Sequence, residues 1–93
     1  MHLSETTRVV AARDQVACDV AEEVVVLNLA SGVYYGLNPV GARVWSLIQQ
    51  PRTFAELRDQ LLQEYEVESA SLEADLRALL TELADQRLIE ITA

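Results

Sequence analysis

Few side chains of this sequence have the chemistry for catalysis. The only histidine is His2, and the only cysteine is Cys18. His2 lies in a terminus without any periodic pattern, so we expect no His-based triad, no zinc site and no general base near neutral pH. Cys18 has no partner for an internal disulfide, and we predict a buried thiol rather than a reactive one.

Carboxylates are plentiful, but their spacing does not indicate acid–base chemistry. Pairs such as Glu64 with Glu66, or Glu73 with Asp75, are far more typical of surface charge than of two catalytic carboxyl groups. None of the three glycines belongs to a phosphate-binding loop. We therefore predict no catalytic residue, no metal ligand and no cofactor, and hence a protein that is not an enzyme by itself.

Binding chemistry is concentrated in a predicted β-hairpin. Two runs rich in Val, Leu and Tyr, residues 24–29 and 33–37, flank a short loop that contains Gly32. The first run is apolar on both faces, which indicates a central strand, and the second is expected at a sheet edge. Adjacent strand residues face opposite sides, so either Tyr34 or Tyr35 enters the core and the other faces out. Such an edge can bind an extended peptide through main-chain hydrogen bonds.

Short elements surround this hairpin. Residues 8–12 and 16–20 are candidate strands, and residues 1–6 are expected to be flexible. Asn38 and Pro39 predict a helix start directly after the hairpin, and this helix must end before Pro51. Trp45 lies beside its apolar stripe, where core packing is favoured over a peptide contact.

The second half predicts two more helices and a final strand. Thr53 and Glu56 form a capping box for a helix that ends near Tyr65. Ser69 or Ser71 is expected to cap a third helix, which continues to about residue 86 before a short strand at 88–91. Strands followed by helices indicate an α+β domain.

Length and charge narrow the function further. The 93 residues make a single domain, 1–93, with a net charge of −8 and no apolar run near the length of about twenty residues that a membrane span needs. We expect a cytoplasmic protein that is a monomer or weak dimer and binds neither membranes nor nucleic acid. The third helix is acidic, with Glu73, Asp75, Glu82 and Asp85, whereas a DNA-reading helix needs a basic surface. A neutral or basic partner is favoured.

Several segments together resemble one family. They are Val26-Leu27-Asn28-Leu29, Gly32-Val33-Tyr34-Tyr35-Gly36-Leu37-Asn38, Gly41, Val44-Trp45-Ser46-Leu47-Ile48, Thr53-Phe54-Ala55-Glu56-Leu57, Tyr65-Glu66-Val67, Ala74-Asp75-Leu76 and Leu83. This pattern, which covers about residues 24–89, resembles the PqqD-like family of leader-recognition domains, and most closely the small partner proteins of lasso-peptide pathways.

The resemblance implies a winged-helix-like fold with a small three-stranded antiparallel sheet and three helices. It implies that the leader of a precursor peptide adds as a strand to the sheet edge, and that the precursor then passes to a leader peptidase and a macrolactam-forming cyclase, without a cofactor. The peptide-binding residues carried over by position are Val33, Tyr34, Tyr35, Gly36 and Leu37 on the strand and Leu72, Asp75, Leu76 and Leu79 on the third helix. Two positions depart from the family pattern: Asn28 stands where relatives often have Asp, and Gln86-Arg87 replaces a common Gly at the end of the third helix.

Two alternatives to a leader-binding adaptor stay open at this point. One is a degenerate winged helix that binds nucleic acid or regulates transcription. The other is a subunit that scaffolds an enzyme without recognising a peptide.

Overall fold

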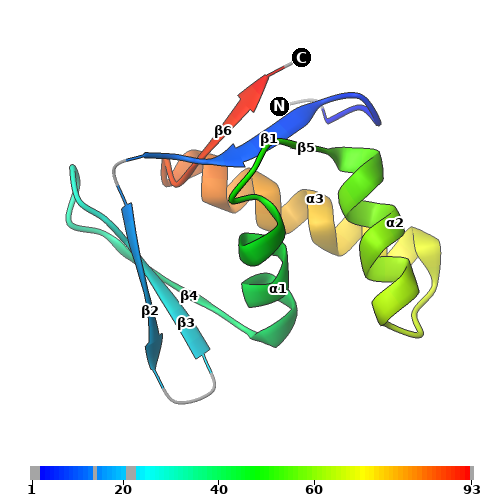
Figure 1. Ribbon diagram of the computed structural model, residues 1–93, viewed down its shortest axis with the longest axis horizontal. Coiled ribbons are helices and arrows are strands. Elements are labelled where there is room, and N and C mark those ends of the chain that lie inside the picture. The colour runs from blue at the N-terminus through cyan, green and yellow to red at the C-terminus, as the bar shows by residue number, and fades with distance from the viewer. Residues whose placement is uncertain (1–2, 14, 21–22, 93) are drawn as a thin grey trace.

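The computed structural model describes residues 3–13, 15–20 and 23–92 (Figure 1). The elements follow one another as β1 (Arg8–Ala11), β2 (Gln15–Val20), β3 (Glu23–Asn28), β4 (Tyr34–Leu37), α1 (Pro39–Leu47), β5 (Arg52–Thr53), α2 (Phe54–Glu64), α3 (Ser69–Asp85) and β6 (Ile89–Thr92). His2 lies outside the described residues.

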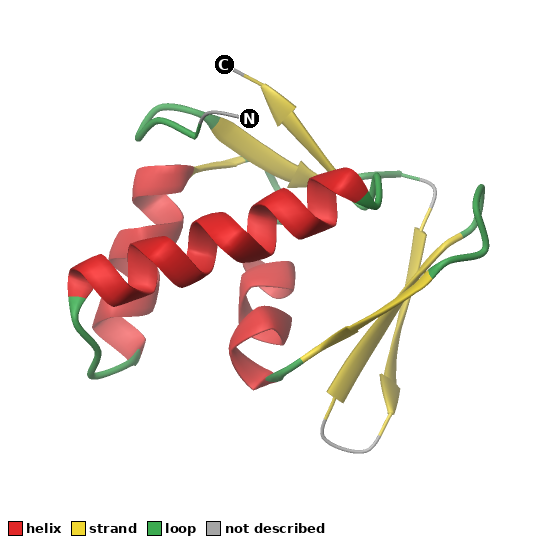
Figure 2. Cartoon of the chain, turned by 180° about the vertical axis from the view of Figure 1, so that it is seen from behind, coloured by secondary structure: helices red, strands yellow, loops and turns green. Residues whose placement is uncertain are grey.

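The strands form two separate three-stranded antiparallel sheets, with the orders β5-β1-β6 and β2-β3-β4. The α+β class and the winged-helix-like description are confirmed. β3 is the central strand of its sheet, as its two apolar faces predicted. The β5-β1-β6 sheet was not predicted from the sequence. In it, β1 pairs with the two-residue β5 and with β6, which both lie far from β1 in the sequence. Seen from behind, α3 crosses in front of α1, and the β2-β3-β4 sheet lies beside the C-terminal end of α3 (Figure 2).

The first two helices begin as their sequences predict. The side chain of Asn38 accepts a hydrogen bond from the Gly41 N–H at 2.8 Å. Thr53 and Glu56 form both bonds of the capping box, at 3.1 and 2.8 Å. The expected cap of α3 is wrong: Ser69 is the first helical residue, the N-cap is Glu68, and no side chain caps the helix.

α3 ends in a left-handed residue that is not a glycine. Arg87 has a positive φ of 58°. Its N–H donates to the Ala84 carbonyl at 3.0 Å, and the Leu88 N–H donates to the Leu83 carbonyl at 2.9 Å. This pair of bonds is a Schellman motif, which ends the helix at the cost of a left-handed residue that carries a Cβ.

The core lies between the helices and the inner faces of both sheets. Trp45 is 5% exposed and belongs to this core, in agreement with its expected role. Cys18, in contrast, is exposed, so the predicted burial of its thiol is wrong. The reason is that β2 is an edge strand whose outer face no other described element covers. The buried apolar residues are Leu3, Val9, Val26, Leu37, Val44, Trp45, Ile48, Phe54, Leu57, Leu61, Leu72, Leu76, Leu80, Leu83, Leu88 and Ile89.

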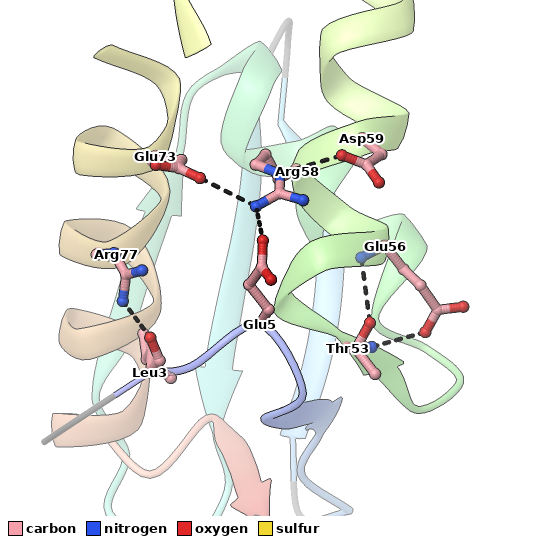
Figure 3. A network of polar contacts seen from close by, with 8 residues as sticks. All are labelled: Leu3, Glu5, Thr53, Glu56, Arg58, Asp59, Glu73 and Arg77. Atoms are coloured by element: carbon pink, nitrogen blue, oxygen red, sulfur yellow. Dashed lines mark hydrogen bonds and ion pairs between the residues drawn. The ribbon is translucent and has the colours of Figure 1, made fainter. Parts of the chain in front are cut away.

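The segment before β1 packs onto the helices (Figure 3). Leu3 is only 3% exposed, and its carbonyl accepts a hydrogen bond from Arg77. Glu5 pairs with Arg58 of α2 at 2.6 Å, and Arg58 also contacts Glu73 of α3 at 3.1 Å. Flexibility of residues 1–6 stays a prediction, but the described part from Leu3 onward has definite contacts that the local sequence pattern did not indicate.

None of the described helices combines the length and the apolarity needed to cross a membrane.

Candidate functional site: the edge of β4 and the face of α3

β4 is the last strand of its sheet, and one set of its main-chain groups is directed away from β3. The Asn28 N–H donates to the Val33 carbonyl at 3.0 Å, and Val26 lies opposite Tyr35 in the same register. Hydrogen-bonded pairs alternate along an antiparallel ladder, so the Val33 carbonyl and the main-chain groups of Tyr35 face β3. Those of Tyr34 and Gly36 therefore point to the open side of the sheet.

The two tyrosines also separate by side chain, which the sequence left undecided. Tyr35 is half-buried and packs against the core, whereas Tyr34 is 70% exposed on the outer face of the sheet. This outer face also carries Val16 and Cys18, both exposed, together with the half-buried Val25 and Leu27. The outer face of this sheet is therefore more exposed than its inner face, where Val26 and Leu37 are buried.

One face of α3 lies across from the edge of β4. Leu72, Asp75, Leu76 and Leu79 recur at helical spacing and so share this face. Leu72 and Leu76 are buried, Leu79 is half-buried, and Asp75 is exposed. The wall is thus apolar at its base, with a carboxylate at its rim.

Two adjoining hollows lie along this face and make up what we call the groove. The first, of about 320 Å³, is lined by Leu72, Asp75, Leu76 and Leu79 together with Val40 and Val44 of α1, Leu61 of α2, and Tyr65 directly after α2. The second, of about 220 Å³, lies between Tyr35, Gly36 and Leu37 on one side and Leu79 and Glu82 on the other. Asn38, Gly41 and Leu79 line both, so the groove runs from the edge of β4 to the junction of the three helices.

Gly41 lets α1 approach the end of β4 closely. A Cβ at this position would lie 3.3 Å from the Asn38 Oδ1 and 3.3 Å from the Leu37 Cδ2 atom. Glycine therefore permits tight packing of α1 against Leu37 and Asn38 at the point where the two hollows join.

A polar contact crosses the groove near the C-terminal end of α3. The Tyr35 hydroxyl donates to the Glu82 carboxylate. Burial of the ring, followed by this hydrogen bond and the negative charge of Glu82, raises the pKa of Tyr35 to about 12. The hydroxyl thus stays protonated at neutral pH and links the inner face of β4 to α3.

The structure brings most of the predicted binding residues to this one groove. Tyr35, Gly36, Leu37, Leu72, Asp75, Leu76 and Leu79 line it. Val33, 40% exposed, and Tyr34 do not line it through their side chains, although the main chain of Tyr34 forms part of the open edge. A peptide contact for any of them stays a prediction. Glu82 was missed, yet it lies one turn beyond Leu79 and the same helical spacing would have included it.

The side chains that line the groove are mainly apolar. Across residues 3–13, 15–20 and 23–92, no group of three His, Cys, Asp or Glu side chains is placed to hold a metal ion. What the groove offers is an apolar floor, acidic groups at the rim and unpaired main-chain groups along one side. These are the features of a site for an extended peptide.

Comparisons with known proteins agree with this class of site. The chain is 37% identical to TbiB1 as solved in complex with the TbiA(beta) leader peptide, with a TM-score of 0.79 over 87% of this chain and 94% of that one. It is 26% identical to a lasso peptide synthetase B1 complexed with the leader peptide, with a TM-score of 0.77 over 88% of this chain and 96% of that one. No curated protein sequence gives a significant match.

The family model of PqqD, the coenzyme PQQ synthesis protein D, matches residues 23–89. The chain belongs to this family. Its matched segment begins at β3 and ends in β6, so it contains both the open edge of β4 and the whole of α3.

Proposed function

We propose that this protein binds the leader segment of a ribosomally made precursor peptide, of the lasso-peptide type, as an additional strand on β4. The observation that carries the proposal is the open edge of β4, whose unpaired Tyr34 and Gly36 main-chain groups adjoin an apolar groove walled by α3. Two similar proteins, TbiB1 and a lasso peptide synthetase B1, were solved with leader peptides, which supports this assignment.

In this proposal the main-chain hydrogen bonds of β4 provide affinity for any leader sequence, and the side chains of the groove select among leaders. Strand addition satisfies the donors and acceptors of Tyr34 and Gly36 whatever the leader sequence. Apolar leader side chains would fill the hollows beside Leu76 and Leu79, and the acidic rim, including Asp75, favours basic leader residues. The inner ring of Tyr35 belongs to the wall and not to the set of edge donors.

The protein acts as a non-catalytic adaptor that presents the bound precursor to a leader peptidase and a macrolactam-forming cyclase. The solved complexes of two similar proteins with leader peptides support the leader-binding part of this role. Incubation of precursor with this protein alone should leave the mass of the precursor unchanged. Addition of the peptidase should then shorten it faster than the peptidase does without this protein.

The main test uses proline at two adjacent positions. Proline removes the main-chain donor, which is tolerated where that donor points to the open side of an edge strand and destabilises an internal ladder. Tyr34→Pro should keep the fold and weaken leader binding by about 5- to 150-fold, the cost of about 1–3 kcal/mol for an unmade hydrogen bond. Tyr35→Pro should lower the melting temperature markedly. Tyr34→Ala, which keeps the donor, is the control and should bind the leader within a few-fold of the unaltered protein.

Fluorescence anisotropy measures binding, and circular dichroism measures the melts. The probes are the fluorescein-labelled leader of the precursor encoded nearest to this protein, the TbiA(beta) leader peptide and duplex DNA. Binding of neither leader contradicts the function, and tight DNA binding at physiological salt supports a nucleic-acid-binding winged helix instead. Normal leader binding by a folded Tyr34→Pro variant rules out strand addition to β4.

A further inference from the structure

Asn28 makes contacts that go beyond its own turn. It is 5% exposed, so its polar side chain is almost wholly buried. Its Oδ1 accepts hydrogen bonds from the N–H groups of Ala30 at 2.9 Å and Ser31 at 3.2 Å, which shapes the turn between β3 and β4. Its Nδ2 donates to the main-chain carbonyl of Gln86 at 3.0 Å. One side chain therefore joins the turn of the hairpin to the end of α3.

The acceptor of that bond is a group that the helix itself leaves unpaired. The last carbonyls of an α-helix have no partner within the helix. In this protein the Schellman motif satisfies the carbonyls of Leu83 and Ala84 through Leu88 and Arg87. The Gln86 carbonyl, at the C-cap, receives the Asn28 amide instead. The pairing is specific for an amide, because a carboxylate could accept the two turn bonds and could not donate to Gln86.

A second contact joins the same two elements on the same side of the sheet. The Tyr35 hydroxyl bonds to Glu82, one helical turn before Gln86. Both contacts lie at the C-terminal end of α3, whereas the other end of the groove, beside Leu72 and Val40, is lined mainly by apolar side chains of the helices. Among the described residues, the side-chain bonds from the β3–β4 hairpin to α3 therefore lie at this end of the groove.

We propose that Asn28 is a positioning residue for the leader site, which sets the distance between β4 and α3 through its bond to the Gln86 carbonyl. This inference rests on the proposed function, since it concerns the width of the same groove. Asn28 touches no part of the groove itself and acts through the hairpin that carries β4. The Tyr35–Glu82 contact depends on it, because the ring meets the carboxylate only while β4 is held at this distance.

Asn28→Asp tests the proposal with a small change. Aspartate keeps the acceptors for Ala30 and Ser31 and loses the donor to Gln86. A typical hydrogen bond contributes a net factor of about 2–10 to an equilibrium constant, so we expect leader affinity to fall by roughly that factor. Ser31→Ala is the matched control. It removes the 3.3 Å contact from the Val33 N–H to the Ser31 Oγ in the same turn and leaves the bond to α3 in place, so leader affinity should not change.

An optical titration of Tyr35 in the free protein separates positioning from a merely structural effect. Asn28→Asp should lower the pKa of Tyr35 from about 12, because the ring loses part of its burial between β4 and α3 and also its fixed place beside Glu82. Comparison with the Tyr35→Phe variant shows which part of the absorbance change comes from Tyr35. An unaltered Tyr35 pKa in a folded Asn28→Asp protein overturns the proposal, whatever the leader affinity.

A double-variant cycle keeps the proposal testable if Asn28→Asp unfolds under the titration conditions. Glu82→Gln, at an exposed position, should weaken leader binding, and Asn28→Asp added to it should cost less than it does alone. Strict additivity of the two effects on affinity, measured at neutral pH, overturns the coupling. If the unaltered protein binds no leader at all, the proposed function fails, while the titration still decides whether Asn28 holds β4 to α3.

Discussion

The two sheets have the same number of strands and different surroundings. In the β5-β1-β6 sheet, the Ala11 N–H of the central strand donates to the Ile48 carbonyl at 2.8 Å. The Ala12 N–H, directly after this strand, donates to the Leu88 carbonyl at 2.9 Å. One edge, β5, is only two residues long. The β2-β3-β4 sheet has an exposed outer face and an edge strand, β4, that borders a groove. We infer that the β5-β1-β6 sheet contributes mainly to stability, whereas the β2-β3-β4 sheet leaves the edge of β4 open for binding.

The largest contrast should appear when one aromatic residue from each region is truncated. Phe54 follows β5, is fully buried, and stacks beneath the Arg77 guanidinium at 4.4 Å from the ring centre. Phe54→Ala should cost about 3–5 kcal/mol of unfolding free energy. Tyr34→Ala, on the outer face of the other sheet, should change it by less than about 0.5 kcal/mol. Urea denaturation measures both, and similar losses would contradict the contrast.

Two neighbouring leucines of α3 should separate stability from binding. Leu80 is fully buried and Leu79 lines both hollows of the groove. Leu80→Ala should cost about 2–5 kcal/mol of stability. Leu79→Ala should cost less stability than Leu80→Ala. Among folded molecules, Leu79→Ala should weaken leader binding more than Leu80→Ala does. Equal affinities for the two variants would remove Leu79 from the site.

Acid should loosen the helices that frame the groove. Hydrogen bonds from Arg43, at 2.8 and 2.7 Å, and from Gln60 hold the pKa of Glu64 at about 2. The unfolded chain has an ordinary Glu pKa of about 4.3, so this carboxylate contributes stability above that pH and loses it as the pH falls towards 2. Urea denaturation between pH 6 and pH 2 should show the loss.

Glu64→Gln serves as the control for this pH dependence. Its unfolding free energy should fall less steeply than that of the unaltered protein between about pH 4 and pH 2, because the variant has no carboxylate to protonate. Identical slopes for the two proteins would show that the Arg43–Glu64 pair does not contribute.

The charge at the groove rim should have a smaller effect, mainly on the association rate. Asp75→Asn removes one carboxylate beside the groove, and Glu90→Gln removes one on β6 of the other sheet. With a basic leader, only the first should slow association by a few-fold at low salt, since screening and distance weaken the second. Stopped-flow fluorescence compares them. Loss of nearly all binding at moderate salt would contradict strand addition as the source of affinity.

The smallest expected change is a gain. Arg87 holds a left-handed conformation at the end of α3, with φ of 58°. Arg87→Gly relieves this strain and should raise the unfolding free energy by about 0.5–1 kcal/mol. Leader affinity should stay the same, because Gln86 keeps its place for Asn28. A loss of stability on thermal unfolding would show that the arginine side chain stabilises the cap by another contact.

Local signals made the hairpin and two helix starts predictable from sequence. The Asn38-Pro39 start and the Thr53–Glu56 box need only neighbouring residues, and the spacing of Leu72, Leu76 and Leu79 fixes one helix face. The features that escaped prediction depend on distant partners. β5 exists because Arg52 and Thr53 pair with β1, and the Tyr35–Glu82 contact spans 47 positions of the chain. The cap of α3 escaped because two nearby serines obscured a start at Glu68.

The burial of Leu3 and the pairing of β6 with β1 have a practical consequence for joining this domain to another protein. β1 and β6, the strands nearest to the two ends of the described chain, pair with each other in the β5-β1-β6 sheet, apart from the β2-β3-β4 sheet (Figure 1). A flexible linker that follows β6 would therefore start at the sheet that does not contain β4. The linker length would then set how close a fused partner comes to the bound peptide.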